Sequence, residues 1–141
     1  HNQTARAGIR QTAHTPTALG EFVDIYPTLA ALAGLPLPKQ LEGISARPLL
    51  DNPDKKWKPA AFSQYPRGKK LMGYSMRTDR YRLTVWLDRQ DHGRTDAIEL
   101  YDHVSDPQEN VNIANEPANA ALVKQLRAQW QRGWQGAKPT A

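Results

Sequence analysis

The chain has 141 residues, which suits one modest domain or a piece of a larger protein. It contains no cysteine, and this excludes disulfides, thiolate nucleophiles and Cys-based zinc sites within the chain. The net charge of +5 is unevenly spread, because residues 55–94 hold eleven Lys and Arg against three Asp. A basic middle segment of this kind indicates either an anionic partner or a solvated basic surface.

The first sixteen residues give no periodic pattern. They are polar, start at His1 rather than Met, and contain the glycosylation triplet Asn2-Gln3-Thr4 and the isolated His14. The chain shows neither a signal peptide nor the run of about eighteen or more apolar residues that is typical of a membrane span. We therefore expect a fragment or a processed chain, whose first residues continue a structure that begins upstream.

The first ordered unit is a helix at about residues 24–33. Apolar side chains recur at intervals of three and four residues, at Phe22, Ile25, Leu29 and Leu32. Pro27 fits only in the first turn, where its missing N–H removes no helical hydrogen bond, and Gly34 ends the helix. Because so short an amphipathic helix needs a larger body to pack on, we expect its apolar face to dock on another part of the protein.

The next segment is rich in proline. Residues 35–59 contain five of them, at positions 36, 38, 48, 53 and 59. This composition predicts an irregular connector that runs over the surface and contributes little to a core.

Four segments with strand character follow, at residues 60–65, 71–78, 81–88 and 98–104. The third shows the clearest alternation, since Tyr81, Leu83, Val85 and Leu87 are separated by more polar residues. The polar residues 89–96 are expected to form a loop. Short connections between successive strands favour an antiparallel sheet with one face covered.

A final helix is predicted to cover that sheet. Asn115 is the expected cap, Pro117 fits the first turn, and the helix runs to about Arg132 and ends at Gly133. Apolar residues step along it in fours, at Ala118, Leu122, Leu126, Trp130 and Trp134. The predicted fold class is therefore α+β.

Four blocks of sequence, in order, resemble the sulfatases. They read VDIYPTLAALAGLPLP with LEGISARPLL, then SQYPR, then MGYSMRTDRYRLTVW, then ELYDHVSDPQENVNIA. Together they cover about residues 18–132, and the second and third are similar to the iduronate-2-sulfatase-like branch. The resemblance implies the C-terminal part of an enzyme with an alkaline-phosphatase-like α/β fold. It divides the chain into the end of the catalytic α/β domain (1–34), a Pro-rich connector (35–59) and a C-terminal sheet-and-helix subdomain (60–141).

The resemblance also implies chemistry that this chain does not contain. Sulfatases use a formylglycine made from a C/S-x-P-S/A-R motif and a divalent cation, usually calcium, to attack a sulfate ester. No such motif occurs in the chain, so we expect neither catalytic residues nor a cofactor in it, and no activity from it alone. Asp91-His92-Gly93 spells a sulfatase metal motif, but it sits in a polar loop and is better explained as a turn. His103 is expected at a strand end rather than in catalysis.

Arg67 is the main candidate for a binding role. It follows Pro66 at the end of a predicted strand, and its planar guanidinium suits sulfate or carboxylate. The resemblance places this block near the cleft between the two subdomains. Arg67 either contacts an anionic substrate or joins the subdomains through a buried ion pair, and the second role is favoured. Gln64, Tyr65 and the lysines Lys69 and Lys70 are further candidates for the cleft.

The predicted function is that of the C-terminal part of a sulfuric ester hydrolase acting on sulfated sugars. Its partners are then the upstream catalytic domain and an anionic sulfated substrate, and the resemblance implies an exported protein. Two alternatives remain open. One is a stand-alone basic module that binds polyanions, although no recognised nucleic-acid motif is present. The other is the C-terminal part of a related phosphodiesterase or phosphonate monoester hydrolase.

Overall fold

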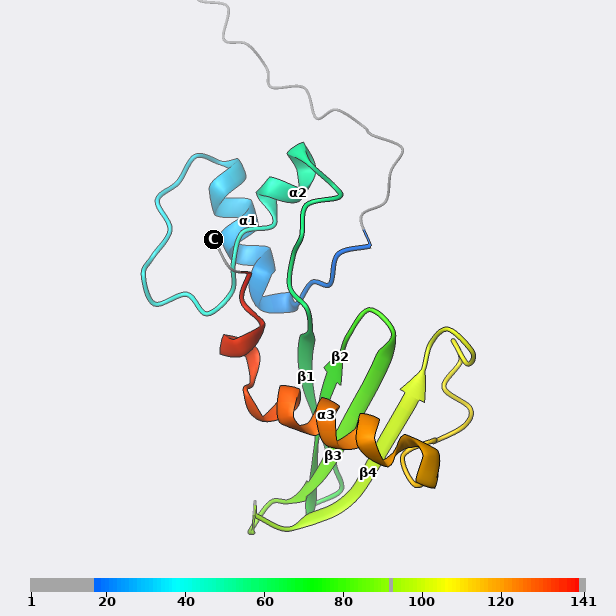
Figure 1. Ribbon diagram of the computed structural model, residues 1–141. Coiled ribbons are helices and arrows are strands. Elements are labelled where there is room, and N and C mark those ends of the chain that lie inside the picture. Colours follow the sequence, from blue (N-terminus) through cyan, green and yellow to red (C-terminus); the bar gives the residue numbers. More distant parts are fainter. Residues whose placement is uncertain (1–16, 92, 140–141) are drawn as a thin grey trace, which may run out of the picture.

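The computed structural model describes residues 17–91 and 93–139, which form an α+β structure built on one antiparallel sheet. The strands lie in the order β1-β2-β3-β4 and one helix, α3, crosses one face of the sheet (Figure 1). The helices α1 and α2 lie beyond the end of the sheet where β1 begins. The strands are β1 (Ala61–Arg67), β2 (Leu71–Arg77), β3 (Tyr81–Asp88) and β4 (Thr95–Asp102). The α-helices are α1 (Ile25–Leu32), α2 (Arg47–Asp51) and α3 (Ala120–Gln131).

The core lies between α3 and the inner face of the sheet. Strand alternation places Met76, Leu83, Val85 and Leu100 on this face, where all four are fully buried, and Leu126 of α3 packs against them. Tyr74 meets Trp130 of α3 edge to face, with 6.4 Å between ring centroids. The predicted antiparallel sheet covered by the last helix is confirmed. The opposite face, here called the outer face, carries more polar side chains.

The first helix begins with the short 3-10 helix η1 (Phe22–Asp24) and continues as α1. Gly34 ends it with φ +69°, and the N–H of Leu35 donates to the carbonyl of Ala30 at 2.9 Å, as in a Schellman motif. The predicted stop is confirmed. The side that packs on the rest of the described chain carries Pro27 and Ala30. The predicted apolar stripe is exposed instead, with Phe22 93% and Leu29 60% accessible, so its docking on another part of the protein stays a prediction.

The connector at 35–59 is more structured than its prolines indicated. It contains α2, in which Pro48 occupies the first turn and so costs no hydrogen bond. It also supplies buried residues, Leu49 and Lys58, which corrects the expectation of a purely surface segment. Lys58 donates to Glu21 at 2.6 Å and to Asp24 at 2.8 Å, and these partners bring the connector into contact with η1.

Two strands extend beyond their predicted ends. β1 continues through Pro66 to Arg67, because Pro66 lies on an edge strand at a position whose missing N–H points away from β2. β4 begins at Thr95 rather than at residue 98, and Thr95 pairs with Leu87 of β3 across a register shift. Neither extension carries an apolar alternation that would reveal it. β4 also ends earlier, at Asp102, whose carboxylate accepts the N–H of Val104 and turns the chain.

The last helix differs from the prediction only at its start. Pro117 opens the 3-10 turn η2 (Pro117–Asn119), and Glu116 rather than Asn115 stands at the cap position. The side chain of Asn119 donates to the carbonyl of Ile113 at 3.1 Å, which holds this turn against the preceding loop. Gly133, with φ +63°, ends α3 as predicted, and a final 3-10 helix, η3 (Trp134–Ala137), follows.

Both edges of the sheet interact with irregular chain. The side chain of Asn112 accepts from the N–H of Leu100 and donates to the carbonyl of Ile98, so it occupies the open edge of β4. On β1 the N–H of Phe62 donates to Glu21 at 2.8 Å. The tail at 1–16, with the triplet Asn2-Gln3-Thr4 and His14, lies outside the described residues, as does His92. Among the described helices none is long and apolar enough to cross a membrane.

Candidate functional site

Arg67 lies at the end of β1, on the outer face, stacked on a buried tryptophan. Its guanidinium carbon is 4.1 Å from the centre of the Trp86 ring, in cation–π geometry. The indole N–H of Trp86 donates to Glu99 at 3.0 Å, and Arg67 Nη1 lies 4.0 Å from the same carboxylate oxygen. Trp86 can lie flat here only because Gly73 faces it, since a Cβ there would approach the ring to 2.7 Å. The stack holds one side of the guanidinium, yet the Arg67 side chain stays 63% exposed.

A small basic hollow adjoins Arg67 at the hairpin between β1 and β2. It measures about 460 Å³, and Lys69, Lys70, Arg94 and Asp96 also line it. The β3–β4 loop reaches this hairpin, because the N–H of Arg89 donates to the carbonyl of Lys70 at 2.8 Å. The structure therefore brings Arg67 and Lys70 together, as the prediction of a common cleft requires. Their cations can attract a sulfate or carboxylate without forming an enclosed site.

The other two predicted cleft residues, Gln64 and Tyr65, do not line this hollow. Gln64 pairs with Tyr74 across the strands and so shares the α3 side of the sheet. It lines a separate hollow of about 420 Å³, together with the aromatic residues Trp130 and Trp134. Tyr65 lies two residues before Arg67 on β1, so both side chains are on the outer face of the sheet. The Tyr65 side chain is 71% exposed. Because neighbouring residues of a strand face opposite sides, Gln64 and Arg67 cannot line one wall.

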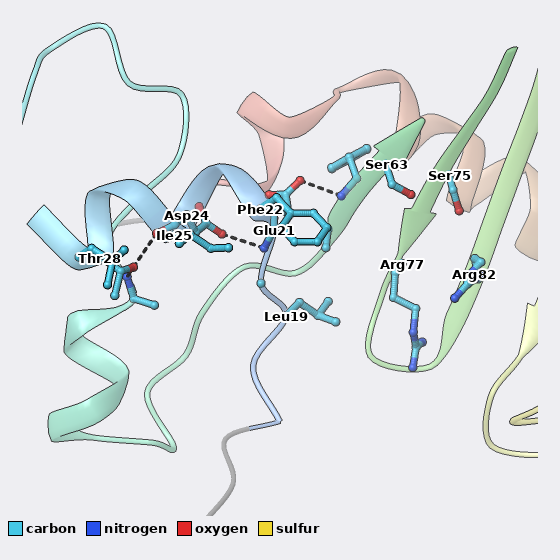
Figure 2. A pocket seen from close by; sticks show the side chains of 15 residues that line it. Leu19, Glu21, Phe22, Asp24, Ile25, Thr28, Ser63, Ser75, Arg77 and Arg82 are labelled. Carbon is cyan, nitrogen blue, oxygen red and sulfur yellow. Dashed lines mark hydrogen bonds between the residues drawn. The ribbon is translucent and has the colours of Figure 1, made fainter. Parts of the chain in front are cut away.

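A larger groove lies at the other end of the outer face, and the sequence reasoning missed it. It measures about 750 Å³ and separates the apolar side chains of η1 and α1 from the strands (Figure 2). Its strand side carries the hydroxyls of Ser63 and Ser75 and the guanidinium groups of Arg77 and Arg82. The sequence did indicate that these two arginines lie together, since Arg77 and Arg82 flank a tight turn between two strands. Their equal distance from the turn makes them cross-strand neighbours.

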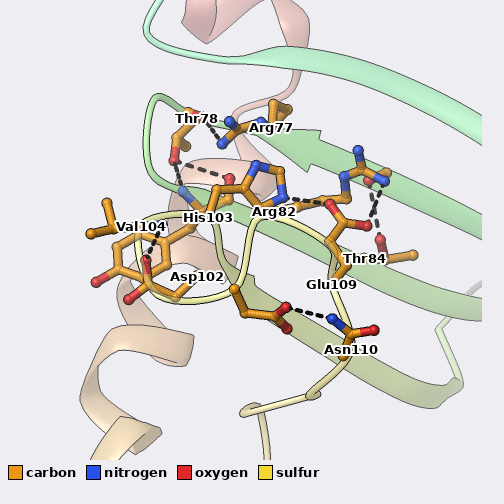
Figure 3. Close-up of polar contacts among 12 residues, drawn as sticks. Arg77, Thr78, Arg82, Thr84, Asp102, His103, Val104, Glu109 and Asn110 are labelled. Carbon is orange, nitrogen blue, oxygen red and sulfur yellow. Dashed lines mark hydrogen bonds and ion pairs between the residues drawn. The ribbon is translucent and has the colours of Figure 1, made fainter.

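A cluster of charges lies beside this groove, where the loop after β4 folds back (Figure 3). Glu109 accepts from Arg82 at 2.9 Å and forms a short contact with His103. Its φ of +59° is unusual for a residue with a side chain, and the contacts with Arg82 and His103 hold it there. His103 was expected within the end of this strand; it instead follows β4 directly and contacts the loop. The N–H of Val111 lowers the pKa of Asp106 below its usual range, as it closes the same loop.

The described residues offer no cation-binding cluster. Among positions 17–91 and 93–139, no three His, Asp or Glu side chains gather as a metal would require. The carboxylate of Asp91 accepts the N–H of Gly93 at 3.1 Å, so the Asp91-His92-Gly93 motif closes the predicted loop, with His92 outside the described residues. Within the described part of the chain, no group of residues matches the divalent-cation site that the resemblance to sulfatases implies, and the sequence contains no C/S-x-P-S/A-R motif.

Comparison with known proteins finds similarity in sequence and in fold to several enzymes. Iduronate 2-sulfatase of Mus musculus is 33% identical over 77% of this chain, which spans 27% of that protein. A protein solved in complex with its substrate D-glucosamine-2-N,6-O-disulfate is 26% identical, with a TM-score of 0.68 over 81% of this chain and 24% of the other. The phosphonate monoester hydrolase of Agrobacterium radiobacter, at 22% identity and a TM-score of 0.60, shares the fold over 77% of this chain and 23% of its own.

The chain thus spans about a quarter of the length of the relatives that it matches. These relatives confirm both the predicted α+β fold and the resemblance carried by the four sequence blocks. Residues 8–135 match the family model for the C-terminal region of N-sulphoglucosamine sulphohydrolase, nearly the whole chain. The chain therefore belongs to this family of sulfatase C-terminal domains.

Proposed function

We propose that this chain is the C-terminal part of a sulfuric ester hydrolase that acts on sulfated sugars. The family match over residues 8–135 carries the proposal, and the named activities of the relatives support it. In this proposal the catalytic residues, formylglycine and a divalent cation such as calcium belong to an upstream catalytic portion. Residues 1–34 complete that portion, 35–59 connect, and 60–141 form the C-terminal subdomain. By resemblance to the sulfatases, we also propose an exported location.

The proposed task of the chain is to shape one wall of the substrate cleft and to stabilise the catalytic portion. Arg67 is the best candidate for the cleft, because Trp86 and Glu99 hold its guanidinium while its N–H groups stay accessible. A planar guanidinium donates two parallel hydrogen bonds to a sulfate group, which the ammonium of a lysine cannot do. Lys70 adds positive potential beside it, and the exposed ring of Tyr65 offers a surface for a sugar.

The first experiment compares the isolated chain with the full-length protein on an aryl sulfate and on a sulfated monosaccharide. We expect turnover from the full-length protein and none from residues 1–141. Turnover by the isolated chain would contradict the proposal that the nucleophile lies upstream. Since the fold is shared with a phosphonate monoester hydrolase, phosphonate and phosphodiester substrates are assayed in parallel. A full-length protein that prefers either of them would move the chain to that related class.

The second experiment separates the two roles of Arg67 in the full-length protein. If Arg67 contacts the substrate, Arg67→Gln and Arg67→Lys lower kcat/KM about 10- to 100-fold, as expected for the loss of a charge-assisted hydrogen bond, and leave Tm unchanged. If Arg67 joins the two portions, Arg67→Gln lowers Tm instead. Lys124→Gln removes the same charge from an exposed position on α3 and is the control.

The basic hollow keeps a second candidate function open, a stand-alone module that binds polyanions. Arg67, Lys69, Lys70 and Arg94 supply its cations. Binding of the isolated chain to heparin that weakens steeply with salt, in a protein without esterase activity, would favour this reading. Esterase activity in the full-length protein with no salt-dependent heparin binding by the chain would reject it.

A further inference from the structure

Two arginines face each other on the outer face at the groove end of the sheet. Arg77 on β2 and Arg82 on β3 are direct cross-strand partners. Like charges in this arrangement repel each other and weaken a sheet. Neither side chain escapes fully into solvent, since both are partly buried and both line the groove. A pair of this kind needs negative charge nearby.

The described residues supply too little of it. Glu109 pairs with Arg82 through one carboxylate oxygen and contacts His103 through the other. The guanidinium of Arg77 donates to the backbone carbonyl of Thr78, and no carboxylate of the described residues lies within 4.0 Å of it. Burial, followed by repulsion from Arg82, lowers the pKa of Arg77 below its ordinary value. Glu109 and Asp79 act on Arg77 only at longer range, so Arg77 faces the groove without a carboxylate of the described residues in direct contact.

The opposite wall of the groove is mainly apolar, although Glu21, Asp24 and Thr28 also line it (Figure 2). Phe22, Ile25 and Leu29 project from η1 and α1, and each is more than half exposed. Contiguous exposed apolar side chains of this size mark surfaces that bind other proteins. Ile25 and Leu29 are aliphatic, and such side chains suit an apolar protein segment better than a heavily hydroxylated and sulfated sugar.

We propose that this groove receives a segment of the upstream catalytic portion that presents a carboxylate to Arg77 and apolar side chains to Phe22, Ile25 and Leu29. The inference rests on the proposed function, because it takes the catalytic portion as its partner. It adds the chemistry of the contact: the segment is amphipathic and carries Asp or Glu on the side facing the sheet. The hydroxyls of Ser63 and Ser75 then lie beneath the segment as hydrogen-bonding groups.

The decisive test measures Arg77→Gln in two settings. In the 141-residue chain the substitution removes the repulsion with Arg82, so Tm stays unchanged or rises. In the full-length protein it removes the partner of the docked carboxylate, so Tm falls by about 2 °C or more. A merely structural role for Arg77 would lower Tm in both settings and would overturn the proposal. Arg89→Gln, at an exposed arginine in the β3–β4 loop, is the matched control and should change neither value.

A photo-crosslinking amino acid in place of Phe22 in the full-length protein identifies the occupant directly. We expect a crosslink to one upstream segment that contains Asp or Glu. A crosslink to a second copy of the protein, or only to residues of this chain, would overturn the proposal. If instead Arg77→Gln raises KM for a sulfated sugar without changing Tm, the groove binds the glycan and the docking proposal is wrong. Failure of the proposed function is read separately, as absence of esterase activity in the wild-type full-length protein.

Discussion

Replacing Lys58 with methionine should separate η1 from the sheet, because Lys58 is the only cation in a buried cluster of described residues. Its ammonium donates to Glu21 and to both carboxylate oxygens of Asp24, and its side chain is 5% exposed. The two carboxylates also accept backbone N–H groups, Asp24 from Ile44 and Glu21 from Phe62. One side chain thus organises contacts between η1, the connector and β1.

The size of the effect follows from what Lys58→Met leaves behind. Methionine fills much of the same space but leaves two carboxylates buried together without a cation. Removing one partner of a buried ion pair costs about 3–5 kcal/mol, because the remaining charge has lost both water and its partner. A single domain of this size is stable by roughly 5–15 kcal/mol, so the loss ranges from about a fifth of its stability to all of it.

Urea unfolding of the 141-residue chain, followed by tryptophan fluorescence and far-UV circular dichroism, measures the loss. Lys56→Met is the matched control, because Lys56 is exposed in the same connector and its replacement should change stability by no more than about 0.5 kcal/mol. The triple variant with Glu21→Gln and Asp24→Asn removes the unpaired charges and should recover part of the loss. A loss below about 1 kcal/mol for Lys58→Met, with no rescue by the triple variant, would refute the assigned role of the cluster.

Three further predictions concern Gly43, Asp102 and Asn112. Gly43→Ala should cost about 1–3 kcal/mol in urea unfolding, because its Cβ would lie 1.9 Å from a backbone oxygen of η1, whereas Gly20→Ala, in open space, should cost almost nothing. Hydrogen bonding to Arg80 lowers the pKa of Asp102 from 3.8 to about 2, so its contribution to stability is complete above about pH 4 and is lost as the pH falls towards 2. Asp102→Asn should therefore flatten the decline in stability measured across that range. Asn112→Ala leaves backbone groups of β4 and its following loop unpaired and should cost about 1–3 kcal/mol, with faster amide exchange at the end of β4.

The sheet was predictable because its pattern is local. Alternating apolar residues at 81–88 predicted β3, and Gly34 and Gly133 predicted the ends of α1 and α3. Each pattern acts within a few residues of chain, and the structure has each feature at the predicted place. The first residues of β4 were not predictable in this way. Thr95 is a strand residue because it pairs with Leu87 across the loop, which is a tertiary contact that no property of its own segment indicates.

Burial of charge was the least predictable feature. A lysine in a Pro-rich connector is usually solvated, and only the approach of Glu21 and Asp24, more than thirty residues away, makes Lys58 a buried residue. The same limit applied to the candidate site. Arg67 was identified from its chemistry and its place at a strand end, but the stack on Trp86 required the fold. The groove beside Arg77 required η1 to lie next to the start of β1, where Glu21 contacts Lys58 and the N–H of Phe62.

The alternation of β1 restricts how the candidate residues can act together. Ala61 and Ser63 at the groove have the same parity as Arg67, which lies about 20 Å further along the strand from Ala61 and about 13 Å from Ser63, at roughly 3.3 Å per residue. A catalytic portion docked in the groove can therefore reach Arg67 only if its surface follows the outer face along the whole of β1. Gln64 faces the α3 side, away from any such contact. In the full-length protein we thus expect Arg67→Gln to change kcat/KM or Tm and Gln64→Ala to change neither. Equal losses from the two variants would mean that the catalytic portion wraps around the edge of the sheet instead of covering its outer face.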